Sequence, residues 1–212
     1  MNLAGQRKRL EWAVRPVASP IASLPITPNQ ITLIGFCFGI AAAALYADGR
    51  LAWAGAAFLA HSVLDLADGY AARKSGKDGV FGAVLDGLSD RYVNGLVLLA
   101  ITAYAWDGNY ALLGLGMVAA VSSIVNSFAK TQAYAESGAA KRAGGRIESE
   151  MEGVGAFGFA ECAITLLACT AGTVIFSVQL MGLALAIVAV GSNVSLAQRL
   201  AFVGVKFGRK KA

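Results

Sequence analysis

Long uninterrupted apolar stretches are the feature that most restricts how this 212-residue chain can fold. A helix needs roughly 20 apolar residues to cross a hydrocarbon core of about 30 Å. The chain is 57% hydrophobic and 15% charged, which is too apolar for a soluble domain. The stretches are continuous rather than alternating, which argues against a β-barrel. We therefore predict an all-α integral membrane protein with six transmembrane helices, at residues 31–47, 52–71, 80–104, 110–136, 154–174 and 177–200.

Lys and Arg residues alternate between the connections and so predict the orientation. They concentrate in the N-terminal arm, in the second-to-third and fourth-to-fifth connections, and in the C-terminal tail, whereas the other three connections contain only Arg50. Cytoplasmic loops retain Lys and Arg. We therefore expect a multi-pass protein of the cell membrane with both termini and the functional site facing the cytoplasm. The alternation supports the six-span count independently of hydropathy.

The N-terminal arm interleaves Lys and Arg with apolar residues such as Leu10 and Trp12. This pattern is typical of an amphipathic helix lying on an anionic leaflet, and a disordered basic arm is the alternative. A net charge of +5 is explained by topology and surface lipid, and gives no reason to expect a nucleic-acid partner. We see no second domain, so we expect one membrane domain over residues 1–212, with an interfacial arm (1–26), a six-helix bundle (31–200) and a basic cytoplasmic tail (201–212).

Four aspartates occupy the second and third apolar stretches, where charge is costly and therefore indicates function. Asp65 and Asp68 lie three residues apart, and Asp86 and Asp90 lie four apart. These spacings put each pair on one helix face. Because the connection between the two stretches is short, we expect the helices to pack antiparallel with both pairs at a similar depth.

Carboxylates brought this close repel one another unless cations neutralise them. Mg²⁺ or Mn²⁺ suits oxygen ligands and leaves open positions for phosphate and water. Two such ions can clamp the attacking and leaving oxygens of a phosphoryl displacement. A structural carboxylate network is the alternative interpretation. Nearby bases are few: Arg73 and Lys74 lie on one side and Arg91 on the other, one residue off the acidic face.

Small residues accompany the acids and permit a backbone or a flat ligand to approach closely. Arg73 can offer a planar fork to a phosphate. The full pattern reads Asp65-x-x-Asp68-Gly69-x-x-Ala72-Arg73 and, after eight residues, Gly82-x-x-x-Asp86-x-x-x-Asp90. It resembles the signature of the CDP-alcohol phosphotransferase family at all eight fixed positions, and Thr27-Pro28-Asn29 resembles the segment that precedes the first span in that family.

The resemblance implies an enzyme of phospholipid biosynthesis that moves a lipid-linked phosphate from a CDP-linked lipid to a small polar alcohol and releases CMP. It implies six spans, a homodimer, and two divalent cations. Asp65, Asp68 and Asp86 would hold the metals. Asp90 would ligate or lie beside them and act as general base on the acceptor hydroxyl. The CDP moiety would be framed by Asp68, Gly69, Ala72, Arg73 and Gly82.

The acceptor should be selected by polar residues on the later spans, and a group of bases suits an acceptor that carries its own phosphate. The candidates are Lys130, Gln132, Lys141, Arg142, Arg146 and Arg199. Short segments ending at Lys130, Glu161 and Arg199 resemble members that use inositol phosphate, such as phosphatidylinositol-phosphate and archaetidylinositol-phosphate synthases. Cys162 departs from those members, which would have Arg there. Glycerol phosphate, serine or another alcohol therefore stays open as the acceptor, and Lys130 and Arg199 alternatively reach the interface as snorkelling side chains.

Two further interpretations stay open at this level. His61 lies one turn before Asp65 and either faces it or is satisfied by packing alone. A cation or proton transporter is the competing functional class, although the acids lie at one end of their spans and no paired broken helices are evident. A binding protein that has lost catalysis is disfavoured because no motif position is missing.

Overall fold

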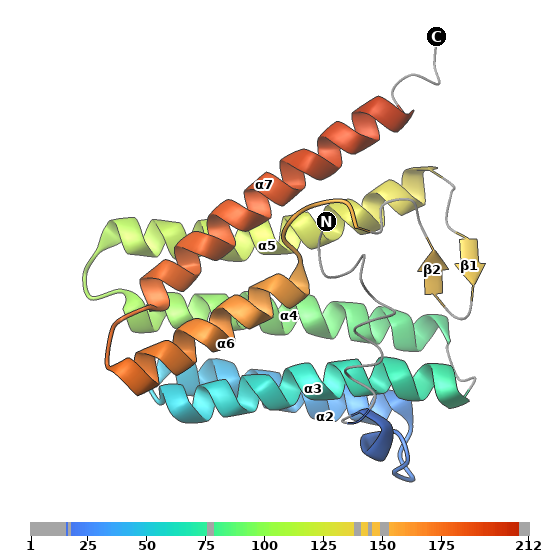
Figure 1. Cartoon of the computed structure of the whole chain (residues 1–212), viewed down its shortest axis with the longest axis horizontal. Helices are drawn as coiled ribbons and strands as arrows, with labels where there is room; N and C mark the ends of the chain where they lie inside the picture. The colour runs from blue at the N-terminus through green and yellow to red at the C-terminus, as the bar shows by residue number, and fades with distance from the viewer. Residues whose placement is uncertain are drawn as a thin grey trace.

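A computed structural model describes residues 16, 18–75, 79–137, 141–143, 146–148 and 153–207 (Figure 1). Its long helices are α2 (Pro28–Ala47), α3 (Leu51–Ser75), α4 (Val80–Ala105), α5 (Tyr110–Ser137), α6 (Phe159–Phe176) and α7 (Met181–Phe207). Between α5 and α6, strands β1 (Lys141–Ala143) and β2 (Arg146–Glu148) pair antiparallel, with Arg142 opposite Ile147. The all-helical prediction is thus confirmed for the body of the molecule. The strand pair was not foreseen, although Gly144 and Gly145 separate it in the sequence, a pair typical of a two-residue hairpin.

Four of these helices are long and apolar enough to span a membrane by length and composition. They are α2, α5 over Tyr110–Ala133, α6 and α7. The helices α3 and α4 have the required length but carry the four aspartates, which lower their mean hydropathy. The expected count of six is therefore supported for four helices. Most of the expected amphipathic arm lies outside the described residues. Within the described part, residues 18–21 form one helical turn, and Ala18 packs against α2 and α3.

Several helix ends differ from the ranges expected from hydropathy: α2 begins at Pro28 rather than 31, α3 ends at Ser75 rather than 71, and α7 begins at Met181 rather than 177. Helix α6 begins at Phe159 rather than 154, because Gly153 and Gly155 adopt positive φ angles of 84° and 96°, which interrupt a right-handed helix. The Glu161 carboxylate then accepts a hydrogen bond from the Gly158 amide at 2.9 Å and caps α6. Helix α7 continues to Phe207, past the expected end at 200.

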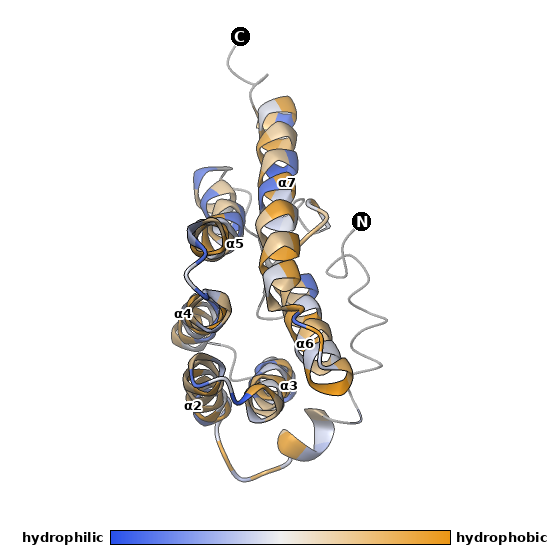
Figure 2. Cartoon of the chain, turned by 90° about the vertical axis from the view of Figure 1, so that its left-hand side faces the viewer, coloured by the Kyte–Doolittle hydropathy of each residue, from blue (hydrophilic) through white to orange (hydrophobic). Residues whose placement is uncertain are grey.

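The helices form two layers, seen end-on in Figure 2, with α2, α4 and α5 in one layer and α3, α6 and α7 in the other. Helix α2 packs closely against both α3 and α4, whereas α3 and α4 hardly approach each other. The expected packing of α3 against α4 is therefore limited to their side chains, whereas the expectation that both acidic pairs lie at a similar depth is confirmed. Both helices are held by α2, and the carboxylates lie between them. The layers enclose a core of large buried side chains that includes Tyr46, Phe58, Leu98, Leu166 and Met181.

Glycines explain how α2 approaches both neighbours. A Cβ at Gly35 would lie 3.2 Å from Leu64 Cβ of α3, and one at Gly39 would lie 2.5 Å from the methyl groups of Val93 in α4. The absence of these side chains lets the backbones come together. Helix α2 therefore fixes the separation of the two helices that carry the aspartates.

The basic connections lie at one end of the bundle, on the right in Figure 1. This end holds the beginning of α2, the α3–α4 connection with Arg73 and Lys74, the strand pair and the end of α7. Arg50, which pairs with Asp48 at 2.6 Å, follows α2 at the opposite end. The basic connections identified in the sequence thus lie at one end of the folded bundle, and the connection with Arg50 lies at the other.

Candidate metal-carboxylate site

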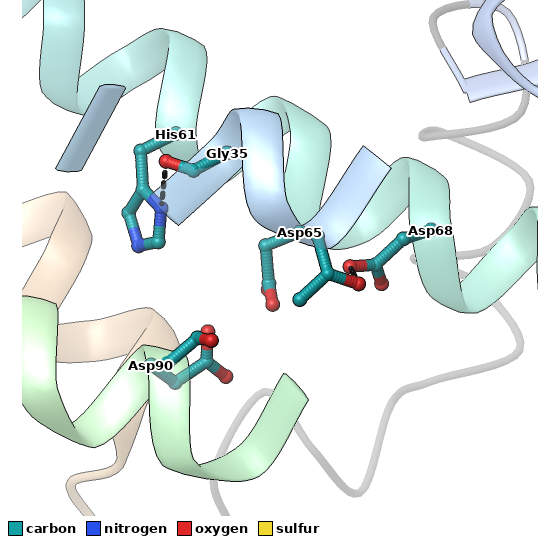
Figure 3. Close-up of a pocket in the computed structure, with 7 residues that line it drawn as sticks. Gly35, His61, Asp65, Asp68 and Asp90 are labelled. Carbon is teal, nitrogen blue, oxygen red and sulfur yellow. Dashed lines mark hydrogen bonds between the residues drawn. The ribbon is translucent and has the colours of Figure 1, made fainter. Parts of the chain in front are cut away.

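Three aspartates converge between α3 and α4. Asp65 and Asp68 come from α3 and Asp86 from α4, and each offers a carboxylate oxygen within 4.8 Å of the others. Asp90 lies one turn further along α4 and interacts with the side chain of Asp65. In Figure 3, Asp65 and Asp90 approach each other from their two helices. The four side chains predicted to act together are therefore brought together by the fold.

A third helix, α2, contributes Thr32 to the site, which sequence reasoning missed. Its hydroxyl donates a hydrogen bond to Asp68 Oδ2 at 2.5 Å, and Asp68 is 4% exposed. The capped start of α2 fixes the position of Thr32 along this helix. Thr27 caps α2, its side chain accepts from the Gln30 amide at 3.3 Å, and its own amide donates to the Gln30 side chain at 2.7 Å. The Thr-Pro start of α2 was a recognisable signal, but it does not reveal which side chain meets Asp68.

A small open pocket of about 170 Å³ lies beside the aspartates. Its walls come from α2, α3 and α4, so all three helices are needed to form it. The lining residues are Thr32, Gly35, His61, Asp65, Asp68, Ser89 and Asp90. The pocket therefore brings polar side chains of three helices together within an otherwise apolar bundle.

The residues expected to frame CDP lie on the basic side of the aspartates. Gly69, Ala72 and Arg73 are partly buried and follow Asp68 along α3. A Cβ at Gly82 would lie 2.9 Å from the Asn29 side-chain oxygen, so the α2 start approaches α4 through this glycine. Their contact with a nucleotide stays a prediction.

Arg91 is directed away from the carboxylate cluster. It donates to the Gly87 carbonyl and, at 3.2 Å, to the Thr131 hydroxyl of α5. The interpretation that Arg91 lies off the acidic face is confirmed. The cluster is therefore not neutralised by a direct bond to this guanidinium.

The candidates for acceptor binding fall in three different settings. Lys130 is partly buried late in α5, and the exposed Gln132 donates to Glu136 at 3.0 Å. Arg199 is 6% exposed and donates to the backbone carbonyls of Val154, at 3.2 Å, and Asn126. The backbones of Lys141, Arg142 and Arg146 form the strand pair, and their side chains lie outside the described part. Acceptor contacts by these six residues stay predictions.

Residues 153–158 form a tightly held segment that sequence reasoning missed. Its Ala156 amide donates to the Gln198 side chain at 2.8 Å, and its Phe157 amide donates to the Ser195 hydroxyl at 3.3 Å. The Asn126 side chain donates to the Phe157 carbonyl at 3.0 Å. Side chains of α5 and α7 thus satisfy the backbone of a segment that has no helical bonds. Such long-range pairing leaves no local pattern in the sequence.

The donor set fits divalent cations. Carboxylate oxygens are hard ligands, and three of them within one small volume repel unless a cation is shared. Asp68 is held in one orientation by Thr32, as carboxylate ligands in metal sites commonly are. The residues present therefore match the metal chemistry expected from the sequence.

Fold and site together define a helical membrane protein with a carboxylate site suited to divalent cations. The family model described as CDP-alcohol phosphatidyltransferase matches residues 25–196, and the chain belongs to this family. The resemblance read from the motif is thereby confirmed.

Two curated relatives show the extent of the similarity. The chain is 37% identical over 134 residues to phosphatidylinositol phosphate synthase of Corynebacterium glutamicum, covering 61% of each chain. It is 33% identical over 121 residues to archaetidylinositol phosphate synthase of Methanothermobacter thermautotrophicus, covering 57% of this chain and 60% of the relative. The chain thus spans about three fifths of the length of these curated relatives.

Solved structures of similar proteins match a larger share of this chain than the curated sequences do. The crystal structure of Mycobacterium tuberculosis phosphatidylinositol phosphate synthase with CDP-DAG bound has a TM-score of 0.73 and 26% identity, covering 90% of this chain and 93% of that one. The same synthase in complex with manganese and citrate also gives 0.73 and 26%, covering 90% and 88%.

Proposed function

We propose that this chain is a metal-dependent transferase of phospholipid biosynthesis. It moves a phosphatidyl-type group from a CDP-linked lipid to a hydroxyl of a phosphorylated polyol, inositol phosphate, and releases CMP. The observation that carries the proposal is the convergence of Asp65, Asp68 and Asp86, with Asp90 beside them, in a chain that belongs to the CDP-alcohol phosphatidyltransferase family.

In this proposal Asp65, Asp68 and Asp86 hold two divalent cations, Mg²⁺ or Mn²⁺, with Asp90 at their edge. When bound, the cations offset the charge of the phosphates and of the departing CMP oxygen. Asp90 accepts the proton of the acceptor hydroxyl as its oxygen bonds to the lipid-proximal phosphorus. The bond from that phosphorus to the CMP oxygen breaks, and CMP leaves with the electron pair.

The substrates follow from the relatives and from charge. The similar proteins are named phosphatidylinositol phosphate synthase and archaetidylinositol phosphate synthase, and one solved structure contains CDP-DAG. Lys141, Arg142 and Arg146 belong to the strand pair at the same end of the bundle as the α3–α4 connection, where a phosphorylated acceptor would arrive. Glycerol phosphate and serine are the acceptors to compare.

The membrane arrangement is part of the same proposal. All six long helices cross the bilayer, with α3 and α4 tolerated there because their carboxylates face a metal site rather than lipid. The basic end of the bundle faces the cytoplasm, and the protein forms a homodimer. Maleimide labelling of single cysteines placed at Lys74 and Arg50 tests the orientation, since the two positions should react from opposite sides.

The decisive experiment measures CMP release by purified protein in detergent with CDP-diacylglycerol and Mg²⁺ or Mn²⁺. Inositol phosphate, glycerol phosphate, inositol and serine are supplied separately. Release with inositol phosphate that is abolished by EDTA and by Asp90→Asn supports the proposal. Asp48→Asn is the matched control, because Asp48 is an exposed aspartate at the opposite end of α2 and should leave the rate unchanged.

Two results would count against the proposal. CMP release with a different acceptor alone would keep the reaction class and reject inositol phosphate. No release with any acceptor, from protein that still binds Mn²⁺, would reject the reaction itself.

A further inference from the structure

His61 is the one histidine of the chain, and it lies in the wall of the carboxylate pocket. It sits one turn before Asp65 on α3 and is 2% exposed. Its Nδ1 lies 3.0 Å from the carbonyl oxygen of Gly35 on α2, a contact drawn as a dashed line in Figure 3. A carbonyl oxygen only accepts hydrogen bonds, so Nδ1 carries the hydrogen. The ring orientation is therefore set by the α2 backbone.

The other ring nitrogen, Nε2, is buried and has no hydrogen-bond partner among the described residues. The described residues show no ion pair of His61, which a buried imidazolium would require. The ring is then neutral, and Nε2 presents a lone pair. A buried acceptor left without a donor is destabilising and rare in native structures, so a donor is expected at Nε2.

The remaining groups of the pocket restrict what that donor can be. Asp65 and Asp90 present carboxylate oxygens, which accept hydrogen bonds, as Nε2 does. A single group that joins two acceptors must carry two hydrogens, and the pocket has room for a water molecule. Asp65 interacts with both Asp86 and Asp90 and contributes to the three-carboxylate cluster, whereas Asp90 interacts with Asp65 and lies outside that cluster. We therefore expect such a water to donate its second hydrogen to the Asp90 carboxylate.

We propose that this pocket binds one ordered water that donates one hydrogen to His61 Nε2 and the other to the Asp90 carboxylate. His61 is then a positioning residue: through the water it holds Asp90 in the orientation in which it accepts the proton of the acceptor hydroxyl. The inference about Asp90 orientation rests on the proposed function, whereas the water bridge itself is a statement about the structure.

The bridge can be tested without activity, because one histidine gives one pair of ring nitrogen signals. Protein labelled with ¹⁵N-histidine in detergent micelles should show a protonated Nδ1 and an unprotonated Nε2 whose chemical shift indicates an accepted hydrogen bond. Asp90→Ala should shift the Nε2 signal, and Asp48→Ala should not. A protonated Nε2, a signal of an unbonded Nε2, or an Nε2 signal insensitive to Asp90→Ala would each overturn the proposal.

Rate measurements on two variants distinguish the roles of the two ring nitrogens. In His61→Asn the amide nitrogen takes the place of Nδ1 and can keep the bond to Gly35, but nothing reaches the position of Nε2. In His61→Gln the amide oxygen reaches that position and loses the Gly35 contact. Removing one hydrogen bond to the bridge should lower kcat of His61→Asn about tenfold with unchanged KM values, while His61→Gln recovers most of the rate.

Mn²⁺ affinity and melting temperature are measured on the same samples. Both variants should bind Mn²⁺ as wild type does, because His61 stands outside the three-carboxylate cluster. A wild-type kcat in His61→Asn, or weaker Mn²⁺ binding in step with the rate, would overturn the positioning role. If wild type releases no CMP with any acceptor, the proposed function fails, and the nitrogen signals still decide the bridge.

Discussion

Replacing Thr32 by Val keeps the shape of the side chain and removes one hydroxyl, which bonds Asp68 and also lies 3.1 Å from the Pro28 carbonyl oxygen of its own helix. Thr32 and Asp68 are both buried, 8% and 4% exposed, and the hydroxyl lies 2.5 Å from Asp68 Oδ2. A hydrogen bond to a charged group contributes about 1.5–3 kcal/mol. Without it, Asp68 can rotate away from the oxygens of Asp65 and Asp86 that lie within 4.8 Å.

We expect Thr32→Val to weaken Mn²⁺ binding by roughly 10- to 100-fold, the range typical of residues that orient a metal ligand. The assay is a titration of purified protein with Mn²⁺ in detergent, in which the EPR signal reports unbound ion. Thr165→Val is the matched control, because among the described residues the Thr165 hydroxyl bonds the Glu161 carbonyl one turn earlier in its own helix, as the Thr32 hydroxyl bonds Pro28. Affinity equal to wild type in Thr32→Val would refute the view that this hydroxyl holds Asp68 for the metal.

Three other changes test separate parts of the structure. Asp90→Asn should bind Mn²⁺ and CDP-lipid while losing CMP release, whereas Asp86→Asn should lose Mn²⁺ binding as well; equal loss of binding in the two would contradict their assigned roles. Gly39→Ala should lower stability by about 1–3 kcal/mol through overpacking, since its Cβ would lie 2.5 Å from the Val93 methyls, and Val93→Ala should restore part of the loss in a thermal melt. Arg199→Leu should cost about 1–3 kcal/mol because it leaves the backbone carbonyls of Val154 and Asn126 without their donor, and an unchanged melting temperature would argue against that structural tie.

The long helices and the acidic pairs could be predicted because both depend on local patterns. Helix α4 was expected over 80–104 and ends at Ala105, and α5 was expected over 110–136 and ends at Ser137. Apolar stretches bounded by turn residues define such limits. Spacings of three and four residues likewise fix the face on which each carboxylate lies, whatever the helix packs against.

Contacts between distant segments could not be predicted. The sequence shows α3 and α4 joined by a short connection, which suggested that they pack together, but the shared neighbour α2 is visible only in the fold. The bond from Thr32 to Asp68 joins residues 36 positions apart, and that from Arg199 to Val154 joins residues 45 apart. Neither pair follows from a helical period. The acceptor candidate Arg199 was selected by charge and position, and its engagement with two carbonyls could not be anticipated from either.

Helix α2 carries no ionisable motif residue, yet it determines the geometry of the site. Gly35 and Gly39 let it approach α3 and α4 so closely that the spacing of those helices is set by its backbone. The same helix supplies the hydroxyl that holds Asp68 and the carbonyl that holds His61. Four carboxylates and a buried imidazole would otherwise have to be oriented by one another, and carboxylates repel. Helices α3 and α4 thus provide the charged side chains. The uncharged helix α2 packs against both and holds these carboxylates at a separation that a metal ion can bridge.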